Sequence, residues 1–260
     1  FIMDSVKVLI LSIVGVVFLV TILVLLYKAY DKISASVGLE NALKLGKINT
    51  SLYTVIPSAE IVKPRDGFNY TFLVSFNVKN FYHNYGNWRH IFHVGTEIDT
   101  NKILEYPYEG EGIDNWDEVT ADFPDQNPGL WLHPTKNTLK LVITTEQFEE
   151  GAFPDHAHPE SSFTATDTKE LEVTKKIINT LDIKDVPMNS DVKLGFSVFQ
   201  NSVTVFMNGS IRTIFTITGK PFENTGSLFI HRNKTYSGLI NYLEIYPTVL
   251  SDKKILEKLK

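Results

Sequence analysis

Residues 192–217 read VKLGFSVFQNSVTVFMNGSIRTIFTI, and this stretch decides the fold. Apolar and polar residues alternate through most of it, which is the two-residue period of a β-strand. Gln200-Asn201 forms a two-residue turn, and Asn208-Gly209 is the strongest short hairpin signal that a sequence offers. The pattern predicts three consecutive antiparallel strands at Val192–Phe199, Ser202–Met207 and Ser210–Ile217.

The same period continues on both sides of this stretch. In residues 68–78 aromatic and aliphatic side chains stand at every second position, which predicts a strand with one buried face. Ser251 is expected to cap a short C-terminal helix that runs to Leu259. Short strands at regular spacing predict an all-β sandwich rather than α/β units. Further strands are predicted at 88–95, 129–132, 138–144, 170–181, 227–231 and 238–246.

Two acidic stretches interrupt the strand pattern. Glu105–Asn127 and Glu146–Lys169 are rich in Pro, Gly and Asp. We expect both to be long loops on the rim of the sandwich, where binding residues concentrate.

The N-terminal part of the chain is different in character. Val8–Tyr27 contains no charged residue and is flanked by Lys7 and Lys28. A helix of this length spans about 30 Å, the thickness of a bilayer's hydrocarbon core. A loose apolar stripe after it predicts a further helical segment that ends at Gly46. The predicted organisation is a transmembrane anchor at 1–28, a helical stalk at 29–48 and a β-sandwich with a short C-terminal helix at 49–260.

The lysines around the anchor indicate its orientation. Four follow it within about twenty residues, whereas Lys7 alone precedes it, so the positive-inside rule places the following domain on the cytosolic side. The absence of Cys agrees with that side. Four glycosylation sequons would favour the outer face, but a chain with 18 Asn and many Ser and Thr has about that number by chance.

The charge balance excludes one class of partner. The formal net charge is −5 and the sequence pI is about 5.8. A nucleic-acid-binding surface requires a basic patch, so no nucleic-acid partner is expected.

Four stretches occur in an order that resembles the concanavalin A-like (laminin-G-like) jelly-roll family, over residues 50–258. The family often has a Trp before the Asn-Gly hairpin, and Met188–Val192 has none. The four stretches are Ile91–Gly95; Asn127–Leu132 with Leu139–Thr144; Val205–Gly209; and Tyr236–Ile240 with Leu243–Tyr246 and Leu250–Ile255.

The resemblance implies two packed antiparallel sheets of the jelly-roll type. It does not imply a single function, because this fold carries lectins, glycosidases, adhesion modules and virion proteins. The anchor followed directly by such a domain, in a Lys-, Asn- and Ile-rich chain, is similar to membrane-anchored proteins of large DNA viruses of the chlorovirus and mimivirus type.

One segment resembles a glycosidase motif. Family 16 glycosidases on this fold carry E-x-D-x-E on one strand, and here Glu97 and Asp99 are followed by Asn101. An amide cannot act as the general acid of a retaining mechanism. We therefore expect no enzymatic activity and assign no catalytic residue.

Two further segments offer ligand chemistry. Two imidazoles and two carboxylates could hold a divalent metal in a Pro-flanked loop, although a solvated loop is the simpler interpretation. The acidic loop could bind calcium, although a solvated acidic face is the simpler interpretation and no cofactor is the main expectation. Its candidates for contact with a sugar are Trp116, Asp114 and Asp117. His90 and His93 are predicted to point to opposite faces of their strand. The metal-site candidates are Asp155, His156, His158 and Glu160.

Two functions of different class follow. The first is a non-catalytic, single-pass membrane protein that tethers other structural proteins, as a minor capsid protein would, to the internal membrane of a virion. Its partners would be the lipid bilayer and capsid proteins, with the β domain on the cytosolic or capsid side. The alternative is a surface glycan-binding or adhesion domain, and a degenerate glycoside hydrolase is the third hypothesis.

Overall fold

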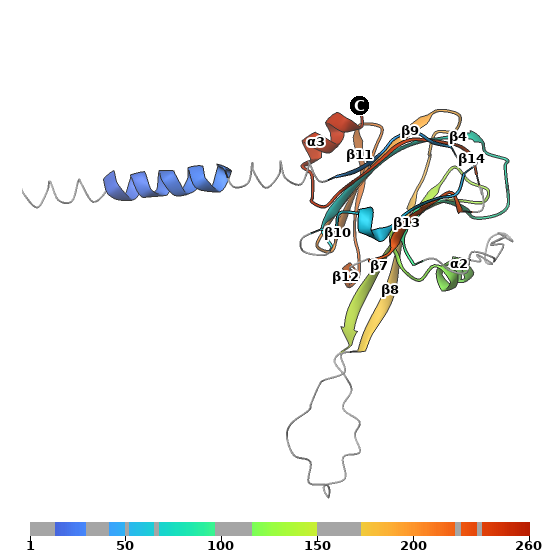
Figure 1. The fold of residues 1–260 in the computed structure, drawn as a ribbon, viewed down its shortest axis with the longest axis horizontal. Helices are drawn as coiled ribbons and strands as arrows, with labels where there is room; N and C mark the ends of the chain where they lie inside the picture. The colour runs from blue at the N-terminus through green and yellow to red at the C-terminus, as the bar shows by residue number, and fades with distance from the viewer. Residues whose placement is uncertain are drawn as a thin grey trace, which may run out of the picture. The chain divides into compact units, whose positions relative to one another are not determined.

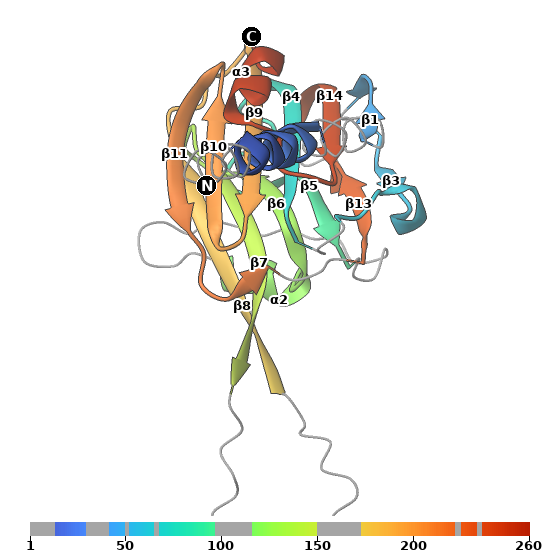
Figure 2. The same ribbon diagram turned by 90° about the vertical axis from the view of Figure 1, so that its left-hand side faces the viewer.

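The computed structural model describes residues 14–29, 42–49, 52–64, 68–96, 116–149, 173–221, 225–232 and 236–260. The chain divides into two units, Phe1–Ala42 and Leu43–Lys260. The second unit is a sandwich of two sheets in which all strand pairs are antiparallel (Figures 1 and 2). The predicted all-β sandwich is therefore confirmed.

The first sheet contains the stretch that decided the fold. Its strand order is β1-β14-β4-β9-β10-β11, and β2 also pairs with β14. The bounds are β1 Leu43–Leu45, β2 Ile48–Asn49, β4 Tyr70–Asn80, β9 Asp191–Phe199, β10 Ser202–Met207, β11 Ser210–Thr216 and β14 Ser237–Tyr246.

The second sheet has the order β12-β7-β6-β5-β13-β3, and β8 pairs with the other side of β7. β7 and β8 continue beyond the rest of the sheet as a two-stranded ribbon (Figure 1). The bounds are β3 Thr54–Ile56, β5 Arg89–Gly95, β6 Gln126–Leu132, β7 Leu139–Glu149, β8 Val173–Ile183, β12 Lys220–Pro221 and β13 Ser227–Ile230.

Aromatic stacking joins the two sheets at the centre of the sandwich. The ring of Phe72 in β4 lies 4.8 Å from that of Phe92 in β5 and 5.4 Å from that of Phe196 in β9, measured between centroids. All three side chains are fully buried. Offset-stacked rings of this kind add to the free energy gained from burying their area.

Short helices cover the outer faces of both sheets. Helix α3 (Asp252–Lys258) places Ile255 close to the first sheet at Gly195, and helix α2 (Trp116–Asp122) packs on the second. A single-turn 3-10 helix, η1, spans Ser58–Glu60. The strand β4 is consequently buried on both faces along most of its length, rather than on one as its sequence predicts.

Three local predictions need correction. The helical stalk is wrong where it is described, because β1 and β2 occupy its last residues and Leu43 and Leu45 pack against the core. The predicted rim loop Glu105–Asn127 contains helix α2. Ser251 does occupy the position before α3, but its side chain makes no capping hydrogen bond.

The predicted single-pass membrane location is wrong for the residues that the structure describes. Over the described ranges, no helix has both the length and the apolar character needed to span a bilayer. The helix in this region covers residues 14–29, which includes Tyr27 and Lys28. Lys7 and Val8 lie outside the described residues.

The turn at Asn208-Gly209 gives a first prediction. Both residues have positive φ, 49° and 77°, as a type I′ hairpin turn requires. Gly209→Ala should destabilise the protein by about 1–2 kcal/mol, because a Cβ penalises this conformation even where space is available. Urea denaturation measures the effect, with Gly46→Ala as the control. No atom lies within 4 Å of a Cβ at Gly46, so equal losses in the two variants would contradict the explanation.

Candidate functional site

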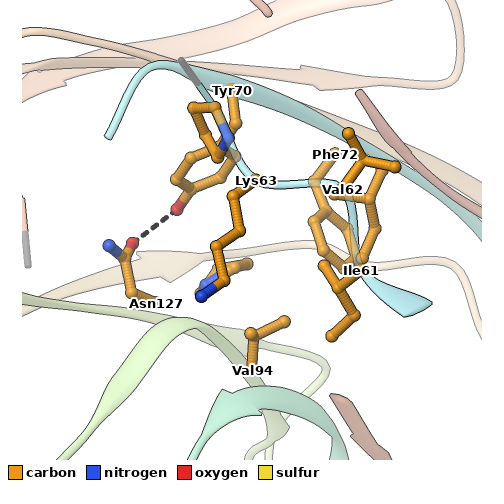
Figure 3. A pocket seen from close by; sticks show the side chains of 10 residues that line it. Ile61, Val62, Lys63, Tyr70, Phe72, Val94 and Asn127 are labelled. Atoms are coloured by element: carbon orange, nitrogen blue, oxygen red, sulfur yellow. Dashed lines mark hydrogen bonds between the residues drawn. The ribbon is translucent and has the colours of Figure 1, made fainter. Parts of the chain in front are cut away.

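A small cavity lies between the sheets near the start of β4 (Figure 3). Its walls are mainly apolar, and Tyr70 at its edge donates a 2.6 Å hydrogen bond to Asn127 Oδ1. Burial raises the pKa of the Tyr70 phenol, so the bond persists over the normal pH range. The cavity volume is about 40 Å³, enough for one or two water molecules and far below the size of a ligand pocket.

A pair of exposed tyrosines lies on the loop 81–88, which crosses from β4 to β5 and so from one sheet to the other. Tyr82 is 78% exposed and Tyr85 is 48% exposed. Their ring centroids are 5.7 Å apart and their planes differ by 37°. The ring of Phe81 packs edge-on against both, at 6.0 and 5.9 Å. We refer to Tyr82 and Tyr85, supported by Phe81, as the tyrosine platform.

Local hydrogen bonds fix the backbone beneath the tyrosine platform. The Tyr82 N–H donates to Asn80 Oδ1 at 3.0 Å, and the Tyr85 N–H donates to the Tyr82 carbonyl at 3.2 Å. Asn84 adopts a positive φ of 53°, which Asn tolerates better than most residues. Its Oδ1 accepts a 3.1 Å bond from Asn87 Nδ2. These hydrogen bonds stabilise the conformation in which the loop presents the two tyrosines.

A buried arginine lies under the same loop. Arg89 has no exposed surface, and its guanidinium donates to the carbonyls of Phe81, His133 and Pro134. The guanidinium carbon also lies 4.6 Å from the centroid of the Phe81 ring, in cation–π geometry. Burial lowers the pKa of Arg89 to about 10, opposed by Tyr85, so the side chain is still charged at neutral pH. Arg89 thereby ties the loop 81–88 to the neighbouring loop 133–138.

This arrangement suits binding through aromatic faces. Tyrosine offers a large apolar ring and a polar hydroxyl, and it loses little conformational entropy when it is held. The side-chain amides of Asn84 and Asn87 stand in the same loop and supply hydrogen-bonding groups. The tyrosine platform can therefore take a flat ligand that combines C–H groups with hydroxyls.

The histidines of β5 are placed differently from their prediction. A register shift between His90 and Phe92 breaks the alternation of side chains, so His90 and His93 lie on the same face. His90 Nε2 and His93 Nδ1 are 2.8 Å apart. The prediction that they point to opposite faces is wrong. In the part of the chain that the structure describes, no group of three or more His, Cys, Asp or Glu is placed to hold a metal ion.

Burial keeps these histidines neutral. It lowers the pKa of His93 to about 3 and, in the same way, that of His231 to about 3. The pKa of His90 is also well below its usual value because of burial and, after that, the nearby His93 and His231. Arg232, which follows His231 after the end of β13, adds a positive charge that acts in the same direction on His90 and His93.

The aromatic residue that was predicted to contact a sugar is buried. Trp116 is 9% exposed and packs against Trp88 at 4.7 Å and Trp131 at 5.8 Å between ring centroids. Asp117 beside it is exposed. Since Asp114 lies outside the described residues, the site formed by the three residues stays a prediction.

The other predicted site residues also lie outside the described ranges. This applies to the metal candidates in the predicted loop Glu146–Lys169, and to the residues of the E-x-D motif and its Asn101. The calcium site and the histidine-carboxylate site therefore remain sequence-based predictions. The predicted site residues outside the described ranges are Asp155, His156, His158, Glu160, Glu97, Asp99 and Asn101.

The tyrosine platform is not among the sites predicted from the sequence, although its residues carry a recognisable signal. Residues 81–87 read FYHNYGN, in which three aromatic residues are interleaved with turn-forming Asn and Gly. Aromatic residues in a strand pattern belong to a core, whereas the same residues in a turn segment have no core to enter. The break in alternation after Lys79 could have identified them.

No family model matches the chain, and no curated protein matches it. Among solved structures, it is similar to the CBM40 carbohydrate-binding module of the Ruminococcus gnavus IT-sialidase bound to α2,3-sialyllactose. The identity is 13%, the alignment covers 84% of this chain and 98% of that one, and the TM-score is 0.48. The chain is also similar to a leech intramolecular trans-sialidase, with 12% identity and a TM-score of 0.47, over 83% of this chain and 27% of that one. The botulinum neurotoxin serotype D binding domain is similar with 10% identity and a TM-score of 0.44, over 84% of this chain and 42% of that one. Likenesses this distant carry no information about the ligand or activity of this chain.

Proposed function

We propose that this protein is a non-catalytic glycan-binding module and that the tyrosine platform is its contact surface. The observation that carries the proposal is the exposure of two adjacent tyrosine rings, at 78% and 48%, on a loop held by local hydrogen bonds. Sugar rings present faces of C–H groups that pack on aromatic rings, and hydroxyls at their edges that hydrogen-bond to amides and phenols. A loop held by a rigid scaffold is the usual place for such a site.

The other hypotheses have less support. A role in tethering a virion shell depended on a membrane-spanning helix, and the described residues contain none. Glycoside hydrolysis depended on Glu97 and Asp99, in a motif whose third carboxylate is replaced by Asn101.

Alanine substitution tests the tyrosine platform directly. Tyr82→Ala and Tyr85→Ala should each weaken glycan binding about tenfold, the loss typical of a central aromatic contact, and the double variant should lose detectable binding. Tyr82 is mostly exposed and Tyr85 about half exposed, so the melting temperature should stay within a few degrees. A glycan array of neutral and acidic oligosaccharides identifies a ligand, and isothermal titration calorimetry on the full chain measures the affinities.

Phe199→Ala is the matched control. Phe199 is 51% exposed and ends β9, next to the end of the sheet where β4 begins and away from the loop 81–88. Its replacement removes a similar exposed ring and should leave binding unchanged. The proposal is overturned if no glycan binds, or if Phe199→Ala weakens binding as much as the two tyrosine variants.

A further inference from the structure

We infer that the tyrosine platform is specific for neutral, extended glycans with C–H faces, such as β-1,4-linked glucose chains, and discriminates against acidic glycans. This inference rests on the proposed function and specifies its ligand class. It follows from three features: the positions of the described arginines, the net charge of the full sequence, and the exposure of the two tyrosine rings.

The arginines are already engaged. Recognition of a sugar carboxylate favours a guanidinium that can make two parallel hydrogen bonds. Arg89 lies beneath the platform, but its two Nη groups donate to three backbone carbonyls, and the buried Nε has no hydrogen-bond partner among the described residues and no access to a ligand. Arg212 bonds to Asp185 and to the Lys184 carbonyl, and Arg232 is 3% exposed against the ring of Phe123. Of the arginines that the structure describes, none presents its guanidinium at the platform.

The lysines near the loop are weak substitutes for an arginine in binding a sugar carboxylate. Lys79 precedes the platform in β4, and Lys136 belongs to the loop that Gly86 contacts through the Pro134 carbonyl. Both lysines are exposed, where an ammonium group is strongly hydrated and its attraction is screened by salt. The formal net charge of −5 repels polyanions over longer distances. Electrostatics therefore do not favour an acidic chain.

The shape of the platform selects an extended ligand. Pockets enclose a terminal sugar on several sides, whereas Tyr82 and Tyr85 are exposed side chains of a surface loop whose rings contact each other. Their centroids lie 5.7 Å apart and their planes are inclined by 37°, so the two rings offer an extended chain two adjacent aromatic contacts. In a β-1,4-glucan the ring substituents are equatorial, so both faces of each sugar expose C–H groups to such rings.

A matched pair of oligosaccharides tests the inference on the full-length protein. Cellohexaose is compared with the same chain oxidised to the carboxylate at C6, by isothermal titration calorimetry. We expect the neutral chain to bind at least about tenfold more tightly, since each charge must be desolvated without a partner. Its affinity should change less than about twofold on raising the salt from roughly 0.05 to 0.5 M. Lys136→Ala should leave the neutral affinity unchanged.

Different results would separate the two proposals. Equal or tighter binding of the carboxylated chain, or a strong loss of affinity with salt, overturns the neutral specificity while the glycan-binding function stands. The same holds if only other, acidic glycans bind and their binding depends on Tyr82 and Tyr85. If no glycan binds at all, the proposed function itself fails.

Discussion

Lowering the pH from about 7.5 to 5 should reduce the free energy of unfolding steeply, because three buried histidines bind protons only when the chain unfolds. His90, His93 and His231 lie in one cluster with Arg232 close by. An ordinary histidine in an unfolded chain has a pKa of about 6.5. Burial holds the pKa of His93 and His231 at about 3 in the folded protein, and that of His90 well below normal.

The direction of the effect follows from proton counting. Below about pH 6.5 the unfolded chain holds a proton on each histidine that the folded protein does not hold, so acid favours unfolding. The stabilisation is complete above that pH and is lost progressively as the pH falls towards 3. Each histidine contributes a slope of up to about 1.4 kcal/mol per pH unit. Three of them together can remove several kcal/mol above pH 5, where most carboxylates are still ionised.

Urea denaturation of the full chain at intervals of pH measures this slope. His93→Phe should reduce the slope by about one third, because it removes one titrating ring and keeps the ring contacts to Phe123 and Phe229. His83→Gln is the control, since His83 is exposed. Should His93→Phe fail to fold, NMR titration of the wild-type imidazole signals gives the same information. A flat stability profile, or signals of His90, His93 and His231 that titrate near pH 6.5 in the folded protein, would rule out the explanation.

The same histidines show where sequence reasoning reaches its limit. The hairpins of β9, β10 and β11 are predicted to within a residue or two, since the positive φ values of Asn208 and Gly209 are a local property of those residues. The placement of His90 and His93 depends on a β-bulge that β5 forms only against β6. Nothing in the sequence of β5 alone indicates it.

Two other differences between the prediction and the structure have a recognisable pattern in the sequence. Leu43-Lys44-Leu45 alternates with the period of a strand, and tertiary pairing with β14 settles it in favour of β1 over a helical stalk. Trp116, Val119 and Phe123 follow the spacing of a buried helical face, which α2 presents to Trp131. Acidic neighbours suggested an exposed loop instead. Charge composition describes the outer face of such a helix and gives no information about the inner one.

Arg89→Met should both destabilise the protein and weaken glycan binding. The substitution removes the charged donors to the carbonyls of Phe81, His133 and Pro134 in a buried site, and the Pro134 carbonyl keeps its bond from the Gly86 N–H. We expect a loss of about 3–5 kcal/mol in the free energy of unfolding, because hydrogen bonds from a charged group are lost and desolvated carbonyls remain. The loop 81–88 should then sample several conformations, and the two tyrosine rings would no longer be held as one surface.

Arg212→Met is the matched control for this change. Arg212 also donates to a backbone carbonyl and to a carboxylate, but its side chain is 40% exposed. Its loss should cost about 1 kcal/mol or less and leave binding unchanged. Urea denaturation gives the stabilities, and calorimetry at a temperature where both variants are folded gives the affinities. Arg89→Lys should fall between wild type and Arg89→Met, since an ammonium group cannot match the fork of a guanidinium. If folded Arg89→Met binds glycan as tightly as wild type, Arg89 stabilises the fold without positioning the tyrosine platform.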